Sequence, residues 1–252
     1  MCTQIDSNGD LVGAEDCLVL NIFVGQPASA QALPVMVFFH GGGNVRGDTQ
    51  QKPFDLPPLA NQGVIVVTVE YRLGVMGFLA LSQLTAEDGT TSGNYGLVDQ
   101  IAALTWVRQN IAAFGGGPTH VMMFGQSAGA GDTEPLLTSP LAKGLFSAAG
   151  IESGAYHSAR LDTLAQAEAS DAPAVSLYGC GGAADVLACL RAVPADTIVT
   201  NESSVSYITT GTSMGTSFHR IRSSLLPRMA RLFLSSSDPT VRRHPHWATT
   251  RL

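Results

Sequence analysis

Short hydrophobic runs, each bounded by glycine or polar residues, recur between residues 18 and 151 of the chain. The runs at 18–24, 35–39 and 64–69 have the length of strands and contain many β-branched or aromatic side chains. The second and third runs lack polar alternation, which is typical of strands buried on both faces of a parallel sheet. The pattern therefore predicts a buried, mostly parallel sheet.

A helix is predicted between the third run and two further short strands. Five hydrophobic residues spaced by three or four form one helical stripe: Leu97, Ile101, Leu104, Val107 and Ile111. The Gly-Gly-Gly-Pro segment at 115–118 is expected to stop this helix. Strands are expected at 121–124 and 148–151, and a mainly helical pattern runs from 155 to about 192. Strands that alternate with helices predict an α/β domain.

The charge pattern changes near the end of the chain. Residues 1–210 carry 19 acidic and 7 basic side chains, whereas residues 211–252 carry seven arginines and one aspartate. The hydrophobic period fades after about residue 203. We therefore expect residues 1–203 to be the N-terminal part of the α/β domain and residues 204–252 to be a poorly ordered, solvated basic tail. Within that tail, residues 225–234 could form one basic amphipathic helix.

Composition excludes several function classes. The net charge of −6 argues against nucleic acid as a partner. No apolar run reaches the roughly 18 residues of a membrane span, and the first residues do not resemble a signal peptide. No Cys-x-x-Cys spacing occurs, so we expect no metal site and no cofactor. The cysteines at 2, 17, 180 and 189 favour two local disulfides in an exported protein, and four free thiols in a cytosolic protein are the alternative.

The segment Gly125-Gln126-Ser127-Ala128-Gly129 fits the pattern Gly-x-Ser-x-Gly. A hydrophobic strand precedes it and a helix is expected to follow, which is the setting of a nucleophile elbow. Small neighbours leave room for the tight turn at the serine, and the helix dipole favours negative charge there. Ser127 is therefore the candidate nucleophile. The alternative is an ordinary glycine-rich turn with a serine that faces solvent.

A second glycine-rich segment, His40-Gly41-Gly42-Gly43, follows a buried strand. Backbone N–H groups of such a run can reach the negative oxygen that develops during acyl transfer, together with the N–H of the residue after the nucleophile, Ala128. A phosphate-binding Walker loop is excluded because no Lys-Ser or Lys-Thr follows the glycines. We expect His40 to anchor the loop rather than to act as a base.

Six motifs in order resemble the type-B carboxylesterases, the family of cholinesterases and fungal lipases. They lie at 15–21, 40–43, 69–74, 93–100, 110–116 and 124–129, and the resemblance covers about residues 2–200. It implies an incomplete α/β-hydrolase fold, with a mostly parallel sheet and flanking helices. It also implies hydrolysis of a small-molecule carboxylic ester through an acyl-serine intermediate (EC 3.1.1.-). Nothing in the sequence specifies the oligomeric state.

The resemblance implies roles for particular residues. Ser127 would form the acyl-enzyme, and Gly42, Gly43 and Ala128 would supply the oxyanion N–H groups. Gln126, a candidate substrate-binding residue, stands where the family often has glutamate, which matters most for cationic substrates. Asn44 stands where an aromatic residue often follows the glycines, so we expect a wider or more polar acyl pocket.

The family resemblance also implies disulfides Cys2–Cys17 and Cys180–Cys189 and secretion of the full-length parent. In similar proteins the acid and the histidine of the triad follow the serine at greater distances than this chain extends. We therefore expect both to be missing, in a chain truncated at both ends.

Two alternatives remain open, one for the missing acid and histidine and one for the function of the chain. Asp238, His244 and His246 follow Ser127 in the required order, but none has the context of a strand end. The other histidines (His120, His157 and His219) are expected to be structural or on the surface. The alternative function is an inactive fragment or a cholinesterase-like binding domain, against which the retained Ser127 argues.

Overall fold

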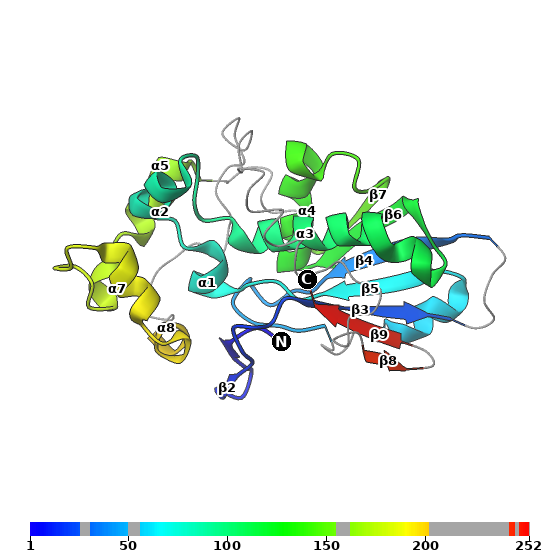
Figure 1. Ribbon diagram of the computed structural model, residues 1–252, viewed down its shortest axis with the longest axis horizontal. Coiled ribbons are helices and arrows are strands. Elements are labelled where there is room, and N and C mark those ends of the chain that lie inside the picture. Colours follow the sequence, from blue (N-terminus) through cyan, green and yellow to red (C-terminus); the bar gives the residue numbers. More distant parts are fainter. Residues whose placement is uncertain (26–30, 50–55, 155–161, 202–241, 245–246, 252) are drawn as a thin grey trace.

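The computed structural model describes residues 1–25, 31–49, 56–154, 162–201, 242–244 and 247–251 (Figure 1). The strands are β1 (Gln4–Ile5), β2 (Leu11–Val12), β3 (Val19–Val24), β4 (Leu33–Phe39), β5 (Ile65–Val69), β6 (Gly116–Gln126), β7 (Ala148–Glu152), β8 (Arg242–His244) and β9 (Trp247–Arg251). The α-helices are α1 (Gly74–Phe78), α2 (Ser82–Asp88), α3 (Tyr95–Asn110), α4 (Ala128–Thr138), α5 (Leu164–Asp171), α6 (Pro173–Leu177), α7 (Val186–Ala192) and α8 (Ala195–Asn201). The 3-10 helices are η1 (Pro57–Gln62), η2 (Ile111–Phe114) and η3 (Pro140–Ala142).

A seven-stranded sheet in the order β7-β6-β4-β5-β3-β9-β8 forms the centre of the molecule. The neighbours β7, β6, β4 and β5 are parallel, whereas β3 pairs antiparallel with β5 and β9. All five residues of β5 are buried, as expected for a strand covered on both faces. The mostly parallel α/β sheet that the hydrophobic runs predict is confirmed.

The predicted helical stripe packs on this sheet. Ile101, Leu104 and Val107 of α3 belong to one buried core with strand residues such as Val37 and Val67. Ile111 joins the same core from η2, which continues α3 for one more turn. In Figure 1, α3 and α4 lie along the sheet.

A second, smaller core lies among short helices away from the sheet. Figure 1 shows α1, α2, α5, α7 and α8 gathered beyond one end of the strands. The buried residues of this second core, from these helices, α6 and the connecting segments, are Val75, Leu79, Leu81, Ala174 and Ile198. The polypeptide reaches this cluster directly from β5 through residues 70–73, so the cluster follows the carboxyl end of a central strand.

Both disulfides that the resemblance implies are present. Cys2 and Cys17 are bonded with Cα atoms 4.7 Å apart, and Cys180 and Cys189 with Cα atoms 5.8 Å apart. Among the described residues, no cysteine remains free. The alternative of four free thiols is therefore excluded.

The predicted helix stop is confirmed at Gly115, which follows η2 in a left-handed conformation. The strand expected at 121–124 begins earlier than predicted, because residues 116–118 already belong to β6. The pairing of Leu33 with Gly116 draws this glycine-rich start into the sheet. Within the expected tail, residues 247–251 pair with β3 and residues 242–244 pair with β9.

The other expectations for the tail stay predictions. Residues 202–241, which include the helix expected at 225–234, lie outside the described part of the chain. The boundary expected near residue 203 is likewise untested. In the described segments, no helix is both long and apolar enough to cross a membrane.

Candidate active site

Ser127 occupies the turn between β6 and α4, at the carboxyl end of a central parallel strand. Its backbone torsions are φ 55° and ψ −123°, a conformation that residues with a side chain rarely adopt. The turn is fixed because the Ser127 N–H donates to the Glu152 carbonyl at 2.9 Å and the Ser127 carbonyl accepts from Gly131 N–H at 2.9 Å. Such strain persists only where the surrounding structure enforces it, and it often accompanies function.

The glycines on either side of Ser127 are required by close backbone contacts. A Cβ at Gly125 would lie 2.2 Å from the Gly129 carbonyl group. A Cβ at Gly129 would lie 2.2 Å from the Phe39 carbonyl oxygen, at the end of β4. The first turn of α4 therefore packs directly against the strand that precedes the second glycine run.

That second run bends beside the candidate nucleophile. A Cβ at Gly41 would lie 3.1 Å from the Ser127 Cβ, so backbone and serine are in close contact. Gly42, Gly43 and Asn44 follow with φ values of 117°, 69° and 57°. Ala128 is the first residue of α4, where N–H groups have no partner within the helix. The roles of Gly42, Gly43 and Ala128 as oxyanion donors remain predictions.

His40 anchors the loop, as the sequence suggested. Its ring is fully buried, its Nδ1 lies 2.9 Å from the Gly41 carbonyl oxygen, and it stacks on Tyr71 with ring centroids 4.5 Å apart. Burial lowers the His40 pKa and raises the Tyr71 pKa well above its ordinary value of 10.0. A neutral, buried imidazole is suited to packing rather than to proton transfer with substrate.

Asn44 is buried beside the glycine run, and the wider or more polar acyl pocket expected from it remains a prediction. Its side chain is buried and donates from Nδ2 to Asp132 Oδ1 at 2.8 Å. Tyr71 donates its hydroxyl to Asn44 Oδ1 at 3.2 Å and to the His40 carbonyl at 2.6 Å. Gln100 of α3 completes the cluster by donating to Asp132 Oδ2 at 2.6 Å. Sequence reasoning missed Asp132, Gln100 and Tyr71.

Asp132 is an unusual carboxyl group because it is almost completely buried and has no basic partner among the described residues. Its exposed fraction is 3%, and burial raises its pKa to about 7 despite the hydrogen bonds from Asn44 and Gln100. The only signal in the sequence is a polar residue five positions after Ser127. A lone aspartate in a helix does not reveal its partner.

The side chain of Gln126 lies against the glycine run. Its Oε1 is 3.1 Å from the position that a Cβ would take at Gly41. Gln126 ends β6, and its backbone pairs with Glu152 of β7. A contact between Gln126 and substrate remains a prediction.

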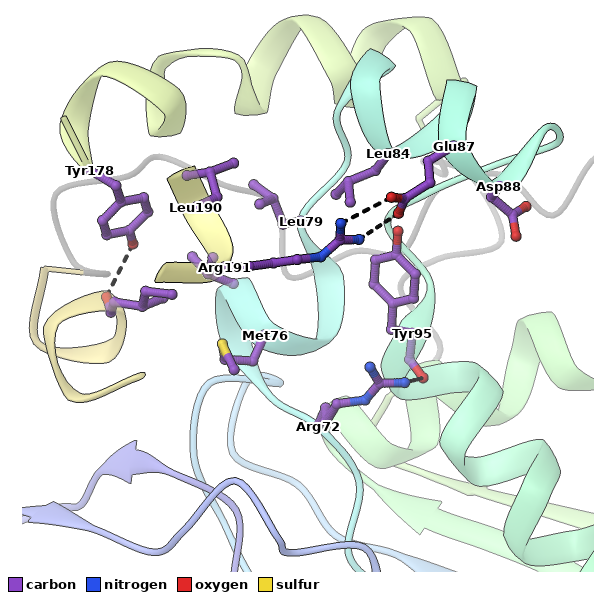
Figure 2. A pocket seen from close by; sticks show the side chains of 12 residues that line it. Arg72, Met76, Leu79, Leu84, Glu87, Asp88, Tyr95, Tyr178, Leu190 and Arg191 are labelled. Atoms are coloured by element: carbon purple, nitrogen blue, oxygen red, sulfur yellow. Dashed lines mark hydrogen bonds and ion pairs between the residues drawn. The ribbon is translucent and has the colours of Figure 1, made fainter. Parts of the chain in front are cut away.

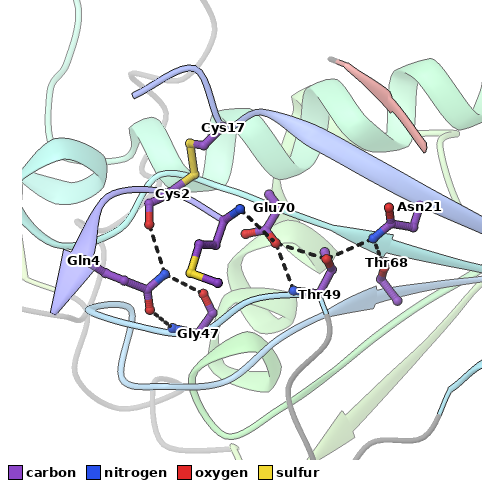
Figure 3. Close-up of polar contacts among 9 residues, drawn as sticks. Cys2, Gln4, Cys17, Asn21, Gly47, Thr49, Thr68 and Glu70 are labelled. Atoms are coloured by element: carbon purple, nitrogen blue, oxygen red, sulfur yellow. Dashed lines mark hydrogen bonds and ion pairs between the residues drawn. A yellow bond between two sulfur atoms is a disulfide. The ribbon is translucent and has the colours of Figure 1, made fainter. Parts of the chain in front are cut away.

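The N-terminal segment supports the far end of the glycine loop (Figure 3). The Gln4 carboxamide donates to the Gly47 carbonyl at 2.8 Å and accepts from the Gly47 N–H at 2.6 Å. Gly47 in turn packs on His40, because a Cβ there would lie 2.4 Å from the imidazole Nδ1. The disulfide at Cys2 holds this segment in place. The buried Glu70 extends the support by accepting from the Thr49 N–H at 2.9 Å.

No histidine is hydrogen-bonded to the Ser127 hydroxyl within the described residues. His120 is exposed on β6 and His40 is engaged as described above. His157, His219, Asp238 and His246 lie outside the described residues, and the side chain of His244 is not described. The described segments also hold no group of three His, Cys, Asp or Glu side chains that could bind a metal.

A cavity of about 540 Å³ lies among the short helices, separate from these residues (Figure 2). Its wall is formed by apolar side chains such as Met76, Leu79 and Leu190. The ion pair between Arg191 and Glu87 spans one side, with Nη1 2.9 Å from Oε1. Ser127 and the predicted oxyanion residues do not line this cavity.

Comparison with known proteins identifies the family of the chain that carries this serine turn. The family model described as "Carboxylesterase family" matches residues 1–242. The chain belongs to the carboxylesterase family. The match continues well beyond residue 200, where we expected the resemblance to end.

Individual relatives support the same assignment. The chain is 47% identical over 167 residues to the para-nitrobenzyl esterase of Bacillus subtilis, covering 66% of this chain and 33% of that protein. It is 37% identical over 206 residues to the juvenile hormone esterase of Tribolium castaneum, covering 80% and 34%. A solved structure of a PNB esterase superposes with a TM-score of 0.70 at 41% identity, covering 81% of this chain and 41% of that one. The chain therefore spans about a third of the length of these curated relatives.

Proposed function

We propose that this chain supplies the nucleophile and the oxyanion hole of a serine carboxylic ester hydrolase (EC 3.1.1.-). In this proposal Ser127 attacks the ester carbonyl and forms an acyl-enzyme, and the alcohol leaves. The observation that carries the proposal is the strained backbone of Ser127 at a strand–helix turn, with Gly41 packed against its side chain.

The glycine run has the chemistry that acyl transfer requires. Negative charge develops on the carbonyl oxygen in the transition state, and fixed backbone N–H groups stabilise it most effectively where water is excluded. Gly42 and Gly43 carry no side chain that would obstruct the carbonyl oxygen. Ala128 adds a donor at the positive end of the α4 dipole.

The residue before the serine favours uncharged esters. Gln126 places a neutral carboxamide where the family often has a carboxylate, which removes one attraction for cationic substrates. We therefore propose a small, neutral carboxylic ester as the substrate. The two disulfides support an oxidising compartment, and we propose that the full-length protein is secreted.

Active-site labelling tests the nucleophile. A fluorophosphonate probe should modify the chain at Ser127, located by peptide mass spectrometry, because the probe captures an activated serine. Ser127→Ala should abolish labelling, whereas Ser153→Ala, which removes another serine with positive φ, should leave it intact. Equal labelling after Ser127→Ala would refute the proposal, whereas absence of labelling in the unsubstituted chain would support the second candidate below.

A second candidate is a binding domain without turnover. It is favoured by the finding that no histidine is hydrogen-bonded to Ser127 in the described part of the chain. Without base and acid, only a small residual rate from binding and the oxyanion hole would be expected. Hydrolysis of p-nitrophenyl acetate by the 252-residue chain, abolished by Ser127→Ala, would exclude this candidate, whereas the absence of such hydrolysis would support it.

A further inference from the structure

Asp132 connects the two segments that form the candidate site. It lies in α4, just after the first turn of the helix that Ser127 caps, and its Oδ1 accepts from Asn44 Nδ2 at 2.8 Å. Asn44 directly follows the glycine run and is separated from Asp132 by 88 positions in the sequence. The contact therefore joins the nucleophile helix to the loop that carries the predicted oxyanion donors.

Asn44 requires such a partner because its backbone conformation is unfavourable. Its φ of 57° is in the left-handed region, which asparagine tolerates better than most residues but still at some cost. Three contacts keep it there: the Asp132 carboxyl, the Tyr71 hydroxyl, and Gly74 N–H, which donates to the Asn44 carbonyl at 2.6 Å. Of these three contacts, the one with Asp132 reaches across to the helix of the nucleophile.

We propose that Asp132 is a positioning residue for ester hydrolysis, which sets the glycine run relative to Ser127 through Asn44. This inference rests on the proposed function. Oxyanion donors are effective only when they are held in place before the reaction, and small displacements reduce the rate strongly. The buried Asp132 carboxyl accepts hydrogen bonds from Asn44 and Gln100 and so holds the glycine run in place.

The role depends on an acceptor oxygen at Oδ1 rather than on negative charge. A protonated carboxyl and a carboxamide both keep a carbonyl oxygen that can accept from Asn44. In Asp132→Asn, the amide nitrogen that replaces Oδ2 would need an acceptor. Rotation of the Gln100 amide can bring Gln100 Oε1 to this position, because Oε1 is buried without a partner among the described residues. Asp132→Asn should therefore preserve the connection, whereas Asp132→Leu removes it while keeping a side chain that branches at the same carbon.

Two measurements on the full 252-residue chain test the proposal. The first is the second-order rate of fluorophosphonate labelling at Ser127, and the second is amide hydrogen exchange in residues 42–46. Asp132→Leu should reduce the labelling rate at least about tenfold and accelerate exchange in this segment. Asp132→Asn should restore most of both properties.

Asp171→Leu provides a matched control. Asp171 is also buried, and it accepts from Ala80 N–H at 2.8 Å in the helix cluster, away from Ser127. Its removal should lower stability without changing labelling or exchange at residues 42–46. A purely structural role for Asp132 would make the two leucine variants behave alike.

The outcomes separate this inference from the proposed function. If Asp132→Leu does not fold, Asn44→Gly removes the same hydrogen bond while tolerating the positive φ, and it should show the same losses. If labelling does not depend on Ser127, the proposed function fails, and the exchange data still decide whether Asp132 fixes the loop. Unchanged exchange in residues 42–46 after removal of either partner would overturn the positioning role.

Discussion

Asp132 makes the stability of this protein depend on pH in a direction opposite to that of most carboxyl groups. Its pKa rises from an ordinary value of 3.8 to about 7 in the folded protein, because burial penalises the charged form. Between these pH values the folded state binds a proton that the unfolded state releases. The stabilisation is therefore complete below about pH 4 and is lost as the pH rises to about 7.

Comparison with Asp132→Asn isolates this contribution. The free energy of unfolding of the unsubstituted chain should fall relative to that of the variant by up to about 4 kcal/mol between pH 4 and pH 7. Urea unfolding at several pH values measures the difference. The buried Asp171, whose pKa is raised to about 6, titrates in both proteins, so its effect cancels. Parallel pH profiles would contradict the assignment of a raised pKa to Asp132.

Gly129 is one of two glycines at the serine turn where a Cβ would lie only 2.2 Å from backbone atoms. Gly129→Ala would force a Cβ to within 2.2 Å of the Phe39 carbonyl oxygen, so α4 and β4 must separate. We expect a loss of about 2–3 kcal/mol in unfolding free energy and a strong reduction in Ser127 labelling. Gly182→Ala, at a site with open space, should change neither property.

The sequence revealed Ser127 and its glycines because their requirements are local. The turn needs small residues at fixed spacing, and the spacing is visible in five consecutive positions. The contacts of Asp132 with Asn44 and Gln100 were not predictable, since they join segments 88 and 32 residues away. No local pattern distinguishes a buried aspartate of this kind from one on a solvated helix face.

At the scale of elements, one buried ion pair connects the segment after β5 to α3. Arg72 donates from Nε and Nη2 to the two carboxylate oxygens of Asp99, each at 2.7 Å. Asp99 is completely buried, and the Arg72 N–H also donates to it at 3.0 Å. This pair fixes the start of α1 and the small helix cluster against the helix that covers the sheet.

Breaking this pair should be far more damaging than breaking the exposed one. Arg72→Met leaves the Asp99 carboxylate buried without its cation, and we expect a loss of about 3–5 kcal/mol in chemical unfolding. Arg191→Met removes the partner of Glu87 from an ion pair at the surface. The Arg191 and Glu87 side chains are 59% and 50% exposed. That variant should unfold at the same denaturant concentration as the unsubstituted chain. Equal losses in the two variants would contradict this ranking.

The central elements were predictable because their hydrophobic patterns are long and uniform. Continuous hydrophobic runs indicate burial on both faces, which revealed the strands at 65–69 and 35–39. Hydrophobic residues along one side of a helix indicate burial of that side, which revealed α3. The start of β6 was missed because Gly116 and Gly117 resemble a helix stop. The residues of β9, Trp-Ala-Thr-Thr-Arg, show too little hydrophobic alternation to reveal a strand. Their partners in the sheet, β3 and β8, are not visible in the local sequence.

At the scale of the whole molecule, the last described residues pair with the edge of β3 that faces away from β5. β9 pairs with β3 along five residues, so that β3 is flanked on both sides. Thr249→Pro, at the position opposite Asn21, removes a backbone donor from β9 and should disrupt this pairing. The freed edge of β3 should then promote self-association, measured by size-exclusion chromatography over a range of concentrations. Thr249→Val keeps the N–H and should elute like the unsubstituted chain.

The strained backbone of Ser127 has a consequence for the stability of the fold. Ser127→Gly relieves the positive φ that Ser127→Ala retains, so the glycine variant should be the more stable of the two by about 1 kcal/mol. Serine at this position therefore lowers the stability of the fold relative to glycine, and the proposed role as nucleophile is what its hydroxyl group would add.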